Sequence, residues 1–212
     1  MDVHARWTHF VGTIGARGDS EGVYDDLDRR YREPGRFYHT WEHVAECLAE
    51  LDAAPGLCDR PAAVELALWY HDAVYDPRAA DNEARSAALL REAAGRLGIG
   101  DGLAAAAAVL VLATAHGPGK APAAPSVCGR DAAVIRDIDL AILGAPPVRF
   151  EAYEAAVRRE YCFLADPDWR AGRSRVLRAF LDRPRLYLTD AFHDRLEGQA
   201  RRNLAAGLGR LA

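Results

Sequence analysis

Apolar residues recur along most of the chain at spacings of three and four positions, which places them on one face of an α-helix. Segments of alternating apolar and polar residues, rich in β-branched and aromatic side chains, are rare. The pattern therefore predicts an all-α protein, a single compact bundle of about ten helices. The predicted helices span residues 7–14, 23–31, 40–51, 62–74, 82–97, 103–115, 132–143, 148–164, 173–181 and 189–208.

Glycine and proline cluster between these helices, and the longest such stretch covers residues 117–129. It follows His116 and precedes an acidic helix, so it is either a cover over a site or a plain connector. No internal repeat or long linker divides the chain. We therefore expect one domain over residues 1–212, with a motif core at about 33–145 and C-terminal helices at 148–208 packing on it.

Three separated segments carry nitrogen and oxygen donors that suit a divalent metal: His39 with His43, His71 with Asp72, and Asp137 with Asp139. Histidines four positions apart share one face of a helix, so His39 and His43 are expected to point into one cleft. Asp72 lies in an apolar segment and, once buried, needs a cation, an arginine or several hydrogen-bond donors. A metal ion would meet that need.

The segments 36–44, 69–72 and 139–141 resemble, in order and residue type, the three sequence blocks of the HD superfamily of metal-dependent phosphohydrolases. They are also similar to blocks in the catalytic domains of cyclic-nucleotide phosphodiesterases. Further similarity, at Tyr38, Asn82, Glu83 and Ser86, is to a bacterial family of predicted HD phosphohydrolases and spans about residues 33–204. The resemblance implies an HD-type helical bundle that hydrolyses a phosphomonoester or phosphodiester, of a nucleotide or another small metabolite.

The resemblance also implies roles for individual residues. Metal ligands would be His43, His71, Asp72 and Asp139, with Asp139 preferred to Asp137 because it matches the family block. His39 would be the general acid, for which imidazole is suited by a pKa near neutrality. One or two ions of Mn, Fe, Co, Ni, Zn or Mg would activate the attacking water.

Three further residues are site candidates, each with a plainer alternative. Glu83 is predicted either to orient the attacking water or to stabilise the first turn of its helix. His116 is predicted to contact a second metal or the phosphate, or else to cap its helix. Arg36 is predicted to bind the substrate phosphate through its forked guanidinium, or to be a solvated loop residue.

Two other functions remain open at this point. The segment His39 to His43 also fits the H-x-x-E-H pattern of zinc peptidases, in which Glu42 would be the general base. That interpretation leaves His71 and Asp72 unexplained. A non-catalytic helical module that binds a nucleotide is the second alternative.

Composition and charge narrow the range of molecules that the protein is expected to bind. A net charge of −4 does not indicate the basic surface that binds a nucleic-acid polymer. A few arginines can still bind a small phosphorylated substrate. No apolar run reaches membrane-spanning length, and the N-terminus lacks the pattern of a secretory signal, so we expect a cytoplasmic protein. The four scattered cysteines are expected to be reduced and mostly buried. The pattern does not indicate an oligomeric state.

Overall fold

The computed structural model describes residues 2–116 and 125–212, and the side chains of all of these except 125–128. This part of the chain contains ten α-helices, a short 3-10 helix and no strand, which confirms the all-α prediction. The elements are α1 (Val3–Thr13), α2 (Ser20–Tyr31), α3 (Trp41–Asp52), α4 (Pro61–Tyr70), α5 (Asn82–Leu97), α6 (Asp101–Ala113), α7 (Pro125–Asp139), η1 (Leu140–Gly144), α8 (Pro147–Glu160), α9 (Asp166–Leu181) and α10 (Asp190–Leu211).

Helix α4 lies at the centre of the N-terminal half, in contact with α3, α5, α6 and α7. Apolar residues occupy all its sides, and a helix of that kind must be surrounded by other elements. Its Trp69 ring packs edge-on against Trp7 at 5.3 Å and Trp41 at 5.8 Å between ring centroids. The Tyr31 hydroxyl donates to the Trp69 carbonyl at 3.0 Å. These contacts fix the C-terminal end of α4.

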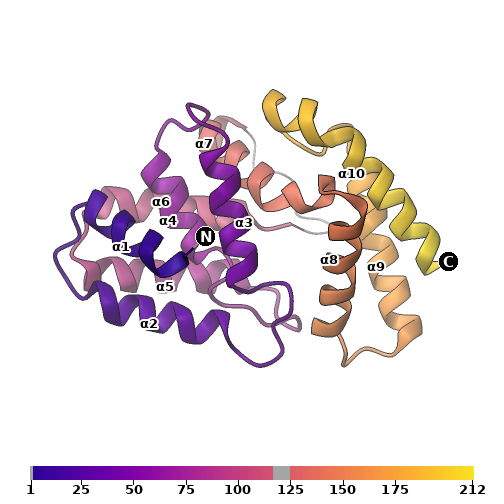
Figure 1. The fold of residues 1–212 in the computed structure, drawn as a ribbon, viewed down its shortest axis with the longest axis horizontal. Coiled ribbons are helices and arrows are strands. Elements are labelled where there is room, and N and C mark those ends of the chain that lie inside the picture. The colour runs from indigo at the N-terminus through magenta and orange to yellow at the C-terminus, as the bar shows by residue number, and fades with distance from the viewer. Residues whose placement is uncertain (1, 117–124) are drawn as a thin grey trace.

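The C-terminal helices α8, α9 and α10, orange to yellow in Figure 1, lie beside the half that contains α1 to α6. Helix α10 packs along α9, and both α8 and α10 contact η1. Tyr187 and Asn203 tie this half to η1, because each donates a side-chain hydrogen bond to a backbone carbonyl of residues 140–145. The segment α7 to η1 thus connects the two halves.

The structure differs from the prediction at two places near the candidate metal ligands. Helix α4 ends at Tyr70 instead of reaching residue 74, so His71 and Asp72 follow the helix. Helix α3 begins at Trp41, and its N-cap is Thr40, whose hydroxyl accepts from the backbone N–H of the second helical residue at 3.3 Å. His39 therefore precedes α3 and does not share a helical face with His43.

The stretch predicted as a loop at 117–129 is partly helical, because α7 begins at Pro125. Gly129 interrupts α7 with a φ of 64°, a backbone conformation that glycine adopts without strain. Residues 117–124 lie outside the described residues, so the two interpretations of this stretch, cover or connector, both stay predictions.

Cys47 is buried, Cys58 is partly buried and Cys162 is exposed, and each of the three is a free thiol. The expectation of mostly buried cysteines is therefore wrong for Cys162. The side chain of Cys128 lies outside the described residues.

Among the described helices, none combines the length and the apolar character that crossing a membrane requires.

Candidate metal centre

The donor atoms of four side chains converge at one point between α3, α4 and α7. The Nε2 atom of His43 lies 3.0 Å from Nε2 of His71, 3.2 Å from Oδ1 of Asp139 and 3.5 Å from Oδ2 of Asp72. From His71, Nε2 lies 3.2 Å from Oδ2 of Asp72 and 3.6 Å from Oδ1 of Asp139. The predicted ligands Asp72 and Asp139 thus each lie close to both histidines.

These separations fit a coordination shell. Nitrogen and oxygen ligands lie about 2.1 Å from an ion such as Zn²⁺. Two such ligands are then about 3.0 Å apart at an octahedral angle and about 3.4 Å apart at a tetrahedral angle. The observed separations of 3.0–3.6 Å bracket both values. His43, His71 and Asp139 therefore belong to a group that could hold one divalent ion, and an oxygen of Asp72 lies beside both histidines.

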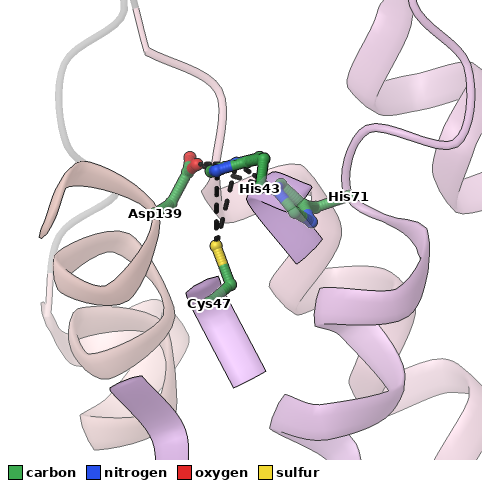
Figure 2. A group of neighbouring side chains, drawn as sticks. All are labelled: His43, Cys47, His71 and Asp139. Carbon is green, nitrogen blue, oxygen red and sulfur yellow. Dashed lines mark hydrogen bonds and ion pairs between the residues drawn. The ribbon is translucent and has the colours of Figure 1, made fainter. Parts of the chain in front are cut away.

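Three chain segments, far apart in sequence, bring these side chains together. His43 projects from the first turn of α3, His71 and Asp72 from the turn that ends α4, and Asp139 from the last residue of α7. In Figure 2 the Asp139 carboxylate and the His71 ring approach His43 from different elements. Because α4 stops at Tyr70, the adjacent residues His71 and Asp72 can both turn toward the same point.

The hydrogen bond at the far side of the His71 ring sets its tautomer. Nδ1–H of His71 donates to the carbonyl of Leu68 at 2.8 Å. In the neutral ring that a metal requires, this hydrogen bond leaves the lone pair of Nε2 directed at the cluster. With both Nε2 atoms 3.0 Å apart, His43 and His71 need a proton or a cation between them.

Cys47 belongs to the same group, since ligand atoms of His43, Cys47, His71 and Asp139 all lie within 4.8 Å of one another. Its Sγ atom is 3.7 Å from both Nδ1 and Nε2 of His43. A sulfur equidistant from the two ring nitrogens lies off the lone-pair axis of Nε2. An ion about 2.1 Å along that axis would be about 4 Å from the sulfur, well beyond a Zn–S bond of about 2.3 Å. In this arrangement Cys47 lies beside the ion position.

The charges in the cluster compensate one another. Burial alone would lower the pKa of His43, but Cys47 and Asp139 beside it raise that pKa to about 10. Burial would also lower the pKa of His71, but Asp72 beside it raises that pKa well above its usual value. Burial would raise the pKa of Asp72 and of Asp139, yet the neighbouring histidines hold both pKa values below the ordinary range. The two carboxylates thus favour positive charge at this point.

His116 extends the cluster on the side of Asp139. Its Nε2 lies 2.8 Å from the second carboxylate oxygen, Oδ2, of Asp139. Its Nδ1 is buried and has no hydrogen-bond partner in the described part of the chain. Asp139 therefore lies between His43 and His116, with one oxygen facing each.

Asp137 makes different contacts from Asp139. Its carboxylate accepts hydrogen bonds from the backbone N–H groups of Leu188 and Thr189, both at 2.7 Å, and from the Thr189 hydroxyl. It anchors the start of α10 and takes no part in the cluster.

His39 lies next to the cluster, held by a carboxylate that the sequence analysis did not select. Glu160 lies at the end of α8. Its Oε2 accepts a hydrogen bond of 2.7 Å from Nδ1–H of His39. Its Oε1 accepts the backbone N–H groups of Phe37, Tyr38 and His39. The Tyr75 hydroxyl also donates to Oε2 at 3.0 Å, and the Tyr75 ring stacks on His39.

Burial would raise the pKa of Glu160, but the bond to His39 and the backbone donors lower it to about 2. Glu160 is therefore a buried anion that orients His39. In the sequence it is one of several charged residues in an amphipathic helix, and no local signal distinguishes it.

Arg36 occupies a different place from the one predicted. Its guanidinium donates to the carbonyls of Asp72 at 2.6 Å, Ala73 at 3.1 Å and His39 at 3.2 Å, and to the carboxylate of Glu33. It is buried and is not part of the cavity lining described next. This position favours a role for Arg36 in tying the two motif segments together over the predicted contact with substrate phosphate.

A cavity of about 570 Å³ opens beside the cluster. Five of the predicted site residues line it: His39, Asp72, Glu83, His116 and Asp139. The rest of its wall is mainly aromatic and aliphatic, with Arg173 and Arg175 contributed by α9. The cluster therefore borders a space large enough for a small organic ligand.

Comparisons of the chain with protein-family models, with curated proteins and with solved structures find no match.

Proposed function

We propose that the protein hydrolyses a phosphate ester of a small metabolite with the help of a divalent metal ion held by His43, His71, Asp72 and Asp139. The observation that carries the proposal is the convergence of these donors, with separations of 3.0–3.6 Å, at the edge of a cavity that His39 also lines. The resemblance of the three sequence blocks to HD phosphohydrolases supports the same chemistry. The choice of a nucleotide as the substrate rests on that resemblance alone.

The chemistry that a divalent ion supplies in such a site is acidification of a water and neutralisation of charge on a phosphoryl oxygen. The protein's own part is to hold four donors in place and to exclude other partners from them. His71 is fixed through Leu68 and Asp139 through His116. Both fixed groups keep one donor atom directed at the cluster.

His39 is suited to protonate the leaving oxygen of the ester. Its Nδ1–H donates to Glu160, so Nε2 is the ring atom left for proton transfer at the cavity. Glu160 and Tyr75 together restrict the ring to one orientation.

The zinc-peptidase alternative has less support. It needs Glu42 as a general base beside the ion, but the Glu42 side chain is 75% exposed and lies 3.9 Å from Arg149. It also needs His39 and His43 as joint ligands, whereas His39 is engaged by Glu160. A non-catalytic binding module would not explain why an oriented histidine borders the cavity next to the donor cluster.

The test compares wild-type protein with His71→Ala/Asp72→Ala, measuring bound metal after dialysis against Mn²⁺, Co²⁺ or Zn²⁺ and turnover of a panel of phosphomonoesters and phosphodiesters. His9→Ala, a change at an exposed histidine of α1, is the matched control. We expect the double variant to lose both metal and turnover. Turnover by the double variant at the wild-type rate, or a wild type that binds metal and hydrolyses no ester in the panel, would overturn the proposal.

A further inference from the structure

One face of α9 forms a wall of the cavity away from the metal ligands. Trp169, Gly172, Arg173, Val176 and Phe180 all line the cavity. They recur at spacings of three and four, so they share one side of the helix. We call these five residues the α9 wall.

Arg173 presents a hydrogen-bond donor to this space. The residue is only 8% exposed, and its Nε and Nη2 donate to the Glu154 carboxylate, while Nη2 also donates to the Tyr153 hydroxyl at 2.8 Å. Its Nη1 donates to no group in the described part of the chain and is not one of the buried atoms that lack a partner. Nη1 is therefore accessible to solvent, on a residue that lines the cavity.

The charge around Arg173 favours an anion. Glu154 balances the charge of Arg173 itself. Arg175 also lines the cavity, is exposed and forms no ion pair within the described residues. The cavity that Arg173 lines is therefore bordered by a second, uncompensated positive charge, which favours an anionic ligand over a neutral one.

Gly172 keeps the space beside Arg173 open. It lies inside a 16-residue helix, where glycine is about 1 kcal/mol less favourable than alanine. A Cβ atom at this position would meet no other atom within 4 Å. The backbone of the wall is thus accessible from the cavity without any rearrangement of the protein.

We propose that the α9 wall holds the organic part of the substrate, and that Arg173 binds an anionic group, a carboxylate or a second phosphate, at the end of that part. The inference rests on the proposed hydrolysis and extends it, because it assigns the substrate class as a phosphate ester that carries a second anion. Trp169, Val176 and Phe180 supply the apolar surface for the part of the substrate that lies between its two anionic groups.

The experiment measures binding to the metal-free full-length protein by calorimetry, so it does not depend on turnover. The probes are phenylphosphonate, 3-phenylpropionate and the neutral 3-phenylpropanol. We expect at least one of the two anions to bind about tenfold or more tightly than the alcohol, as for a hydrogen bond to a charged group. The anion that binds more tightly identifies the group that Arg173 recognises.

Two variants with matched controls locate the binding. Arg173→Gln/Glu154→Gln removes both charges together, so that no unpaired carboxylate is left buried, and should abolish the preference for anions. Its control is Arg149→Gln/Glu46→Gln, a part-buried pair outside the cavity lining.

Gly172→Leu should fill the cavity and weaken the binding of all three probes without lowering the melting temperature. Its control is Gly95→Leu in α5, also helical and with open space at Cβ.

Three results would each overturn the inference: no binding of any probe by the wild type, equal binding of anions and alcohol, or an anion preference that survives in Arg173→Gln/Glu154→Gln. A wild type without esterase turnover that still shows the Arg173-dependent preference would separate failure of the proposed hydrolysis from failure of this subsite.

Discussion

The carboxylate of Glu160 lies 2.7 Å from Nδ1 of His39, although 121 positions separate the two residues in the chain. The same carboxylate accepts three consecutive backbone N–H groups, so it fixes both the ring and the segment that carries it. Helix α8 thereby determines the orientation of a residue in the first motif.

Glu160→Gln tests Glu160 as a positioning residue. The amide keeps the shape but replaces the anionic acceptor of the His39 ring with a neutral one. We expect kcat to fall about 10- to 100-fold with little change in KM, a smaller loss than the roughly 100- to 10,000-fold contribution of a general acid, because His39 itself is retained. A rise in KM as large as the fall in kcat would indicate a purely structural role.

The same carboxylate predicts how stability depends on pH. Its pKa of about 2 in the folded protein lies below the ordinary value of 4.5, so the stabilisation is complete above about pH 4.5 and is lost as the pH falls toward 2. The total is on the order of 3 kcal/mol. In urea unfolding, the stability advantage of wild type over Glu160→Gln should shrink over this pH interval. A difference that stays constant from pH 6 to pH 2.5 would contradict the assignment.

Asp137 and Asp139, two residues apart, provide a matched pair of changes. Saturating metal at about 100 times its Kd should stabilise the wild type by about 2.7 kcal/mol. Asp139→Asn should abolish this metal-dependent increase in melting temperature. Asp137→Asn should lower stability by about 1–3 kcal/mol, through weaker bonds to the start of α10, and keep the increase. Identical responses of the two variants to metal would rule out the division of roles.

Cys47 is expected to be dispensable for holding the ion. Because its sulfur lies off the lone-pair axis of His43, Cys47→Ala should keep the metal stoichiometry of the wild type. The wild-type protein loaded with Co²⁺ should show no sulfur-to-cobalt charge-transfer band in the near ultraviolet. A clear band that disappears in Cys47→Ala would place the thiolate in the coordination shell instead.

Arg36→Gln should act on stability more than on substrate binding. The change leaves the carbonyls of His39, Asp72 and Ala73 without their charged donor. We expect a loss of about 2–4 kcal/mol of unfolding free energy, measured by urea denaturation, because the glutamine amide can replace some of these bonds and each acceptor left unsatisfied costs about 1–3 kcal/mol. In the proposed reaction, KM should stay within about threefold of wild type, since Arg36 does not line the cavity. A large rise in KM at unchanged stability would restore the phosphate-binding interpretation.

Local sequence patterns were enough to predict most of the secondary structure and to select the candidate ligands. Helical periodicity predicted the all-α class, and the predicted span of 82–97 coincides with α5. It failed at the end of α4, which stops at Tyr70 and not at residue 74. Apolar periodicity continues across a helix end when the turn beyond it is also buried, so the pattern alone does not reveal the stop.

The sequence by itself determined which residue types could bind a metal, because histidine and aspartate donors are recognisable wherever they occur. Only the tertiary structure decided that Asp139 and not Asp137 faces the histidines, that Glu160 orients His39, and that Arg36 binds carbonyls. Each of these depends on which side chain a distant helix brings within hydrogen-bonding distance. That distance is set by packing between elements, which leaves no mark on the residues nearby in the chain.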